Sequence, residues 1–162
     1  MNSVLEWAAN EQANGKTEGS AEITAPVFWI TGLSGVGKTT LAKEIVERFR
    51  IDSFAVVHLD GDQIRELNAN DLGYDPEDRI KNAYRISRFC QFMQAQNIPV
   101  VCSTMSLYPE IWKWNQENIE PYFQVYIRAE MKVLEGRDTK GLYSGFKNGR
   151  EANVVGLDLK FN

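Results

Sequence analysis

A glycine-rich run at residues 32–39 constrains the fold of this chain more than any other feature. The run reads Gly32-Leu-Ser-Gly-Val-Gly37-Lys38-Thr39, which is the spacing of a loop whose backbone N–H groups surround phosphates at the start of a helix. The apolar residues 27–30 before it are typical of a buried strand, and residues 38–50 after it carry apolar side chains at helical spacing. Strand, loop and helix therefore follow in the order that phosphate binding requires.

The chemistry of this loop predicts ATP and Mg²⁺ as ligands. Lys38 is expected to neutralise the β- and γ-phosphates, and the Thr39 hydroxyl to coordinate the Mg²⁺ that bridges them. With Gly at about 7% of residues, the four fixed positions of this motif occur together by chance in on the order of one chain in a hundred. The strand before the motif and the helix after it therefore favour a functional loop over a chance match. The other loop residues expected to contact ATP are Gly32, Leu33, Ser34, Gly35, Val36, Gly37 and Thr40.

The rest of the chain alternates between strand and helix patterns. Strands are predicted at residues 55–59, 100–103 and 123–127, and helices at residues 76–96, 110–118 and 131–136. This alternation indicates an α/β protein with a mainly parallel sheet, the three-layer α/β/α sandwich of P-loop NTPases.

The same pass along the chain predicts its domain organisation. We expect one domain at residues 25–162, preceded by a polar lead-in at residues 1–24 that contains a weak helix. Residues from 137 onward are Gly-rich and are predicted to form an irregular, mobile lid.

Composition and charge exclude several classes of function. The formal net charge of −4 and the pI near 5.1 argue against broad binding of nucleic acid or anionic membranes, because both need a basic surface. Neither a signal-peptide pattern nor an apolar run of membrane-spanning length occurs, so a cytoplasmic enzyme is expected. The two cysteines, Cys90 and Cys102, have neither metal-ligand spacing nor a disulfide framework and are predicted to be reduced and buried.

Two carboxylates, Asp60 and Asp62, follow the second predicted strand. Side chains at the carboxyl end of a parallel strand face the ligand crevice of such a sheet, and alternation along an extended chain puts both carboxylates on one side. One could hold the magnesium shell while the other accepts the proton of a substrate hydroxyl. Together with Lys38 they are the candidate catalytic residues, and a solvated turn is the alternative interpretation.

Three arginines are spaced to project from helices that border the same crevice, namely Arg65, Arg79 and Arg85. Arginines clamp anions by bidentate hydrogen bonds, although each one taken alone is more often a member of a surface ion pair. His58 lies in an apolar strand and, as the only histidine, lacks partners for a metal site. We therefore predict a structural role for His58.

Several ordered motifs make the chain resemble the adenylyl-sulfate kinase family over residues 27–158. They are Gly32-Leu-Ser-Gly-Val-Gly-Lys-Thr-Thr40, Leu59-Asp-Gly-Asp-Gln-Ile-Arg65, Asp71-Leu-Gly-Tyr-Asp-Pro-Glu-Asp-Arg79 with Asn82, and Arg137-Asp-Thr-Lys-Gly-Leu-Tyr143. The resemblance implies an ATP-dependent kinase that phosphorylates the ribose 3′-hydroxyl of adenosine 5′-phosphosulfate. It also suggests a homodimer.

The resemblance implies roles for individual residues as well. It makes Asp62 the base at the 3′-hydroxyl and places Asp60 in the metal and phosphate network. Arg137 and Lys140 resemble lid residues that cover ATP and exclude water. Tyr74 stands where the family usually has a Phe that stacks on the acceptor's base. The residues expected to bind the acceptor nucleotide are Arg65, Tyr74, Arg79, Asn82 and Val154.

Departures from the family pattern lie on the acceptor side. After the strand at residue 100 the family reads Ser-Pro-Phe/Tyr-Arg, whereas this chain reads Ser103-Thr-Met-Ser-Leu-Tyr108-Pro and lacks the arginine. Ala152 replaces a Lys that faces the phosphosulfate. Val154 replaces a second stacking Phe, and base stacking contributes on the order of 1 to 3 kcal/mol at single-stranded sites. Family members also continue beyond the point where this chain stops, so a sheet one strand shorter is expected.

Two acceptors therefore stay open. The number of motifs favours adenosine 5′-phosphosulfate, whereas the pocket chemistry favours cytidine diphosphoramidate, the acceptor of a relative in bacterial capsule modification, with its smaller base and less anionic tail. A noncatalytic nucleotide-binding protein derived from a kinase is a more remote alternative. A GTP-dependent switch is disfavoured, because no guanine-reading Asn-Lys-x-Asp element occurs.

Overall fold

A computed structural model describes residues 24–138 and 140–159 of the chain. Four parallel strands form one sheet in the order β2-β3-β1-β4, which confirms the predicted parallel sheet. The predicted lead-in at residues 1–24, with its weak helix, lies outside the described residues except for Thr24. The strands are β1 (Val27–Thr31), β2 (Val57–Asp60), β3 (Val100–Thr104) and β4 (Tyr122–Tyr126).

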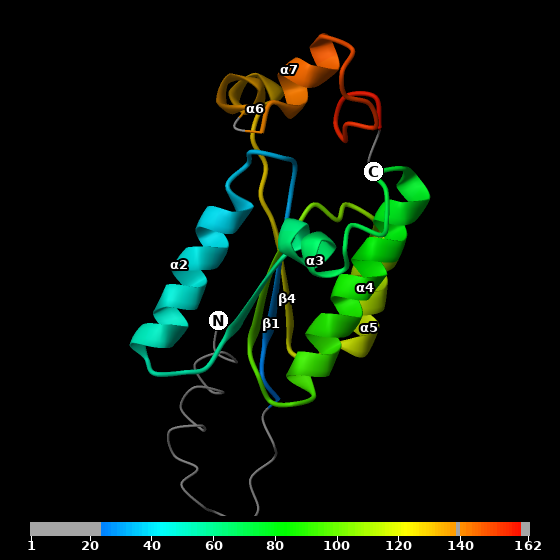
Figure 1. Cartoon of the computed structure of the whole chain (residues 1–162). Helices are drawn as coiled ribbons and strands as arrows, with labels where there is room; N and C mark the ends of the chain where they lie inside the picture. Colours follow the sequence, from blue (N-terminus) through cyan, green and yellow to red (C-terminus); the bar gives the residue numbers. More distant parts are fainter. Residues whose placement is uncertain (1–23, 139, 160–162) are drawn as a thin grey trace, which may run out of the picture.

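Helices cover both faces of this sheet (Figure 1). α2 (Lys38–Ile51) packs against one face, whereas α4 (Pro76–Gln94) and α5 (Pro109–Asn118) lie on the other. The predicted three-layer α/β/α arrangement is confirmed. Over residues 24–138 and 140–159, the structure contains no helix with the length and apolar character needed to cross a membrane.

Capping side chains explain where two of the helices begin. Asp75 precedes α4, and its carboxylate accepts a hydrogen bond from the backbone N–H of Asp78 at 2.9 Å. Asp60 does the same for α3 (Gly61–Leu67), because it accepts the N–H of Asp62 at 3.0 Å. The seven residues of α3 are too few for an apolar period to reveal the helix from sequence.

The segment after α6 (Met131–Arg137) is more ordered than its glycines predict. A second short helix, α7 (Leu142–Lys147), occupies part of the stretch predicted to be irregular. Asp138 explains the difference, because its carboxylate accepts hydrogen bonds from the backbone N–H groups of Tyr143 and Ser144 at 3.0 and 2.9 Å. The prediction of irregular structure is therefore wrong for this stretch.

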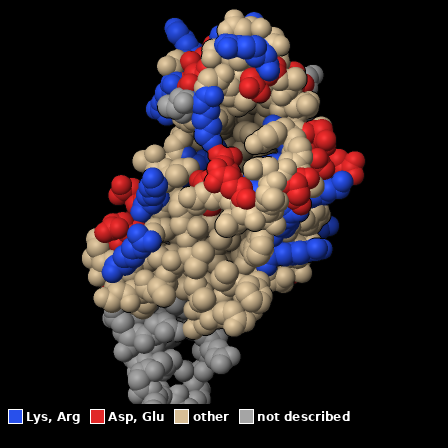
Figure 2. All heavy atoms as spheres, in the orientation of Figure 1, with Lys and Arg blue, Asp and Glu red and all other residues tan. Residues whose placement is uncertain are grey.

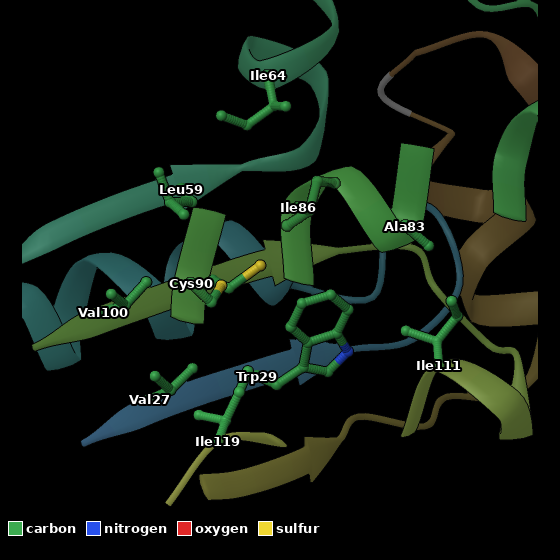
Figure 3. Close-up of a cluster of buried hydrophobic side chains, with 11 residues drawn as sticks. Val27, Trp29, Leu59, Ile64, Ala83, Ile86, Cys90, Val100, Ile111 and Ile119 are labelled. Carbon is green, nitrogen blue, oxygen red and sulfur yellow. The ribbon is translucent and has the colours of Figure 1, made fainter. Parts of the chain in front are cut away.

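The largest apolar cluster lies between the sheet and the helices α4 and α5. It centres on Trp29, which is fully buried, with Ile86 and Ile111 among its neighbours (Figure 3). Cys90 and Cys102 are buried in the same cluster and are free, as predicted. Full burial of each large apolar side chain contributes about 1.5–3 kcal/mol, so this cluster holds α4 and α5 firmly on the sheet.

A second cluster, here called the lid cluster, joins the phosphate loop to the segment that contains α6 and α7, which is called the lid below. Leu33 and Val36 of the loop pack with Leu134 of α6, Tyr143 of α7 and Val154. Figure 1 shows α6 and α7 beyond the end of the sheet at which the loop lies. The apolar residues of the loop therefore position the lid, while its glycines and polar residues are left for the ligand.

Candidate active site

The phosphate loop has a backbone conformation that favours glycine. Gly32 has a φ of 149°, and a Cβ there would lie 2.4 Å from the carbonyl oxygen of Ile127. Gly37 has a φ of 102° immediately before α2. Side chains with a Cβ rarely adopt such positive φ values. The glycines therefore let the chain turn from β1 into α2, so that the helix N-terminus faces the loop.

A cavity of about 370 Å³ lies beside the loop. Figure 2 shows a hollow between the lid and the body of the molecule, with basic and acidic side chains around it. Of the residues predicted to bind ATP or the metal, all but Gly32, Leu33 and Val36 line this cavity. The lining residues are Ser34, Gly35, Gly37, Lys38, Thr39, Thr40, Asp60, Gly61, Asp62, Thr104, Met105, Arg137 and Lys140.

Lys38 is a partly buried cation in this cavity. Its Nζ donates a hydrogen bond to the carbonyl oxygen of Leu33 at 2.8 Å. Burial, and next the positive charge of Lys140, lower the pKa of Lys38 to about 8, although Asp62 and Asp60 act in the opposite direction. An anion bound beside Lys38, such as a phosphate, would favour the charged form of the Lys38 ammonium group.

Asp60 is held by three hydrogen bonds. Its Oδ2 accepts from the hydroxyls of Ser103 at 2.8 Å and Thr39 at 3.0 Å, and its Oδ1 accepts from the backbone N–H of Asp62 at 3.0 Å. Partial burial acts to raise the pKa of Asp60, but the hydrogen bonds outweigh it and lower the pKa below its ordinary value. Asp60 is therefore an ionised carboxylate beside the hydroxyl predicted to bind Mg²⁺.

The side-chain oxygen atoms of Thr39 and Asp60 fit Mg²⁺. Within the described part of the chain, no group of three or more His, Cys, Asp and Glu side chains gathers into a metal site, so the protein offers no complete metal cage there. Mg²⁺ is usually bound by one or two protein carboxylates together with substrate phosphates. The Thr39 hydroxyl and the Asp60 carboxylate supply such oxygens next to the phosphate loop.

Asp62 differs from Asp60 in its position and partners. Alternation along an extended chain predicts the two carboxylates on one side, but Asp62 lies in the first turn of α3 rather than in a strand. Asp60, at the end of β2, contacts Thr39 and Ser103. Asp62 instead forms an ion pair with Lys140 of the lid, and its side chain stays 60% exposed. Both carboxylates nevertheless line the ATP cavity.

A smaller cavity of about 60 Å³ adjoins the first one. The two cavities share Gly61, Asp62, Thr104 and Met105 as lining residues. The lining of the smaller cavity includes four of the predicted acceptor-binding residues, Arg65, Tyr74, Arg79 and Asn82.

Tyr74 is the only aromatic side chain among the described residues that line the smaller cavity. The guanidinium of Arg65 lies 4.5 Å from the centre of its ring, and that of Arg79 lies 5.3 Å away. These distances are typical of cation–π contacts. The residue remains 57% exposed, so the ring keeps surface on which a base can stack.

On the acceptor side, two residues selected from the sequence lie apart from both cavities. Val154 is 1% exposed and packs in the lid cluster. Its neighbour Asn153 reaches the acceptor side, because its carbonyl oxygen accepts a hydrogen bond from Arg79 Nη2 at 2.9 Å. Arg85 forms a bidentate ion pair with Asp71 at 2.8 and 2.7 Å, so it braces the segment before α4 and does not line either cavity.

Sequence reasoning did not select a consecutive run, Thr104, Met105 and Ser106, that lines the smaller cavity, here called the acceptor cavity. They end or follow β3, which runs parallel to β1 and beside it. Ligands of open parallel sheets bind beyond the carboxyl ends of the strands, so this rule applied to β3 would have identified them. Their side chains alone carry no distinctive chemistry.

The sequence model of one family, adenylylsulphate kinase, matches residues 24–162. This chain belongs to the adenylylsulphate kinase family. Membership in that family confirms the resemblance drawn from the motifs and accounts for the phosphate loop, the lid and the parallel sheet. The chain is therefore a kinase of this family, whose members bind ATP and transfer phosphate to a hydroxyl group.

Relatives of known name agree with the adenylylsulphate kinase assignment. Cytidine diphosphoramidate kinase of Campylobacter jejuni is 35% identical over 136 residues, which cover 84% of this chain and 79% of the relative. Adenylyl-sulfate kinase of Halothermothrix orenii is 37% identical over 129 residues, which cover 80% of this chain and 70% of the relative. The solved Mycobacterium tuberculosis APS kinase in complex with AMPPNP and APS has a TM-score of 0.80 at 26% identity, covering 86% of this chain and 83% of that one.

Proposed function

We propose that this kinase transfers the γ-phosphoryl group of Mg-ATP to the ribose 3′-hydroxyl of cytidine diphosphoramidate or a closely similar cytidine nucleotide. The observation that carries the transfer is the place of Asp62, which lines both the ATP cavity and the acceptor cavity. A base at this junction can reach a hydroxyl that faces the phosphates. Transfer then needs positioning and charge neutralisation and no covalent enzyme intermediate.

Asp62 acts as the base in this proposal. As the bond from the 3′-oxygen to the γ-phosphorus forms and the bond to the β-phosphate oxygen breaks, Asp62 accepts the hydroxyl proton. Lys140 pairs with Asp62 in the structure. The phosphates of ATP are a competing anion for Lys140, and its move toward them frees the carboxylate.

The donor side is organised around the phosphate loop. Lys38 neutralises the β- and γ-phosphates, and Arg137 lies next to the loop because its Nη1 donates a hydrogen bond to the carbonyl oxygen of Gly35 at 3.3 Å. Thr39 and Asp60 would hold Mg²⁺, which would neutralise part of the charge of the phosphates.

The acceptor side supports a cytidine nucleotide. Tyr74 provides a single aromatic face, because Val154 stands at the second stacking position and is buried in the lid cluster. Ala152 is exposed and provides no cation for a phosphosulfate. A smaller base with a less anionic tail suits this chemistry, and the relative named for that acceptor is similar over 84% of this chain. Such an enzyme would serve capsule phosphoramidate biosynthesis.

Adenosine 5′-phosphosulfate is the second candidate acceptor. Arg65, Arg79 and Asn82 belong to the motifs shared with adenylyl-sulfate kinases, and all three line the acceptor cavity. With this acceptor the enzyme would serve sulfate assimilation.

Assays with each acceptor separate the two candidates. We expect kcat/KM for cytidine diphosphoramidate to exceed that for adenosine 5′-phosphosulfate by about ten-fold or more, because loss of one stacking platform costs on the order of 1 to 3 kcal/mol. Phosphorus NMR of the product should show a new 3′-phosphate. Asp62→Asn is the matched control, since it keeps the shape of the side chain but should abolish transfer while ATP still binds.

Other outcomes of these assays decide the alternatives. A preference for adenosine 5′-phosphosulfate would overturn the cytidine assignment. Unchanged turnover in Asp62→Asn would disprove the role of Asp62, and absence of turnover in the wild type with both acceptors would favour a noncatalytic nucleotide-binding protein. Ala152→Lys restores a cation at an exposed position and should raise kcat/KM for the phosphosulfate selectively.

We also propose that the kinase forms a homodimer through the outer face of α4. Phe89 and Phe92 are 37% and 60% exposed on this helix. They line a groove of about 760 Å³ together with Tyr84 and the cationic residues Lys81, Arg85 and Arg88. Exposed aromatic side chains that cluster on one helix face are typical of an interface.

A further inference from the structure

A chain of hydrogen bonds links Asp60 to Ser103 and His58. Ser103 Oγ donates to Asp60 Oδ2 at 2.8 Å, and His58 Nε2 lies 3.0 Å from the same Ser103 hydroxyl. The parallel register of β2 and β3 pairs Asp60 with Ser103. His58 and Asp60 are two residues apart in β2, so alternation places both on the same face of the sheet.

The direction of each hydrogen bond follows from the proton inventory. Asp60 is ionised and can only accept, so the single hydroxyl proton of Ser103 is used toward Asp60. At its contact with His58, Ser103 must therefore be the acceptor and the imidazole the donor. This arrangement places the His58 proton on Nε2.

We propose that His58 and Ser103 are positioning residues that hold the Asp60 carboxylate in the orientation required for the magnesium shell. The proposal rests on the assignment of Asp60 to that shell under the proposed function. Ser103 and Thr39 both donate hydrogen bonds to Oδ2 of Asp60. The Thr39 hydroxyl thus uses its proton in the hydrogen bond to Asp60. The lone pairs of its oxygen remain available to coordinate the ion.

The arrangement explains why a histidine stands between the apolar residues Val57 and Leu59 of β2. Its ring is partly buried, and its N–H supports the Ser103 hydroxyl. A hydrogen-bond donor behind a metal-binding carboxylate restricts the orientations of that carboxylate, and loss of such outer partners typically costs 10–100-fold in metal affinity or activity. The structural role predicted from the sequence thus becomes a role in the site.

The test measures the Mg²⁺ dependence of turnover in variants of both residues. Ser103→Ala and His58→Leu should raise the Mg²⁺ concentration for half-maximal rate by about ten-fold and lower kcat, with no change in ATP binding measured without Mg²⁺. His58→Gln retains an N–H donor of similar reach and should recover most of the loss. Ser87→Ala removes a buried hydroxyl outside the site and is the matched control for Ser103→Ala.

Two results would overturn the proposal. One is unchanged Mg²⁺ dependence in both Ser103→Ala and His58→Leu. The other is an equal loss in His58→Gln and His58→Leu, which would indicate packing alone. If His58→Leu fails to fold in a thermal melt, Ser103→Ala decides by itself. Asp60→Asn tests separately whether Asp60 belongs to the magnesium shell. Normal Mg²⁺ dependence in that variant would disprove this part of the proposed function, whatever the result for His58 and Ser103.

Discussion

Lys38 illustrates how a single residue responds to the site around it. In the protein without ligand, burial and next Lys140 lower its pKa to about 8. The negative charge of ATP phosphates raises the pKa of a nearby ammonium group. Near pH 8.5 we therefore expect ATP binding to take up a fraction of a proton, and ATP affinity to fall as the pH rises above 8. At pH 6.5 Lys38 is already charged, so no uptake by this group is expected.

Calorimetry in two buffers of different ionisation enthalpy measures this proton uptake. Lys38→Met should bind ATP more weakly and should lose the uptake at pH 8.5. Equal uptake in the wild type and the variant would show that another group takes up the proton.

At the scale of elements, the lid is tied to the phosphate loop by α7. The Tyr143 hydroxyl donates a hydrogen bond to the carbonyl oxygen of Ser34 at 2.9 Å. Burial, and then the charges of Asp138 and Glu135, raise the pKa of Tyr143, so the hydroxyl stays protonated and remains a donor at working pH. This bond orders the lid against the loop before either substrate binds.

Removal of that hydroxyl should loosen the lid. A hydrogen bond of this kind contributes about 0.5–1.5 kcal/mol, so we expect Tyr143→Phe to raise the KM for ATP by about two- to ten-fold. A looser lid should also admit water and increase ATP hydrolysis without acceptor. Tyr126→Phe at an exposed residue of β4 is the control, and identical ATP kinetics in the two variants would argue against the tie.

The elements show where sequence patterns suffice and where they do not. The strands follow from short apolar runs, because helices cover both faces of the sheet, whereas α2, α4 and α5 follow from apolar periodicity because each buries one face. α3 and α7 do not, because seven and six residues carry too little pattern. Their starts depend on Asp60 and Asp138, whose carboxylates accept backbone N–H groups.

At the scale of the whole molecule, the groove on α4 predicts the assembly state. Light scattering should give twice the chain mass of 18.4 kDa. Phe92→Glu places a charge in the proposed interface and should yield a monomer, because burying an unpaired charge there is unfavourable. Ile51→Glu changes a residue that is 65% exposed on α2 and should leave the dimer intact. A monomeric wild type would contradict the proposal.

By itself the sequence determined the phosphate loop, the alternation of strands and helices, and the family. These depend on glycine spacing and apolar periodicity, which are local properties of the chain. Only the tertiary structure decided which residues line the acceptor cavity and which ones form hydrogen bonds with Asp60. Ser103, Thr104 and Asn153 enter the site through strand register and lid packing. These contacts join residues more than forty positions apart, so no local pattern encodes them.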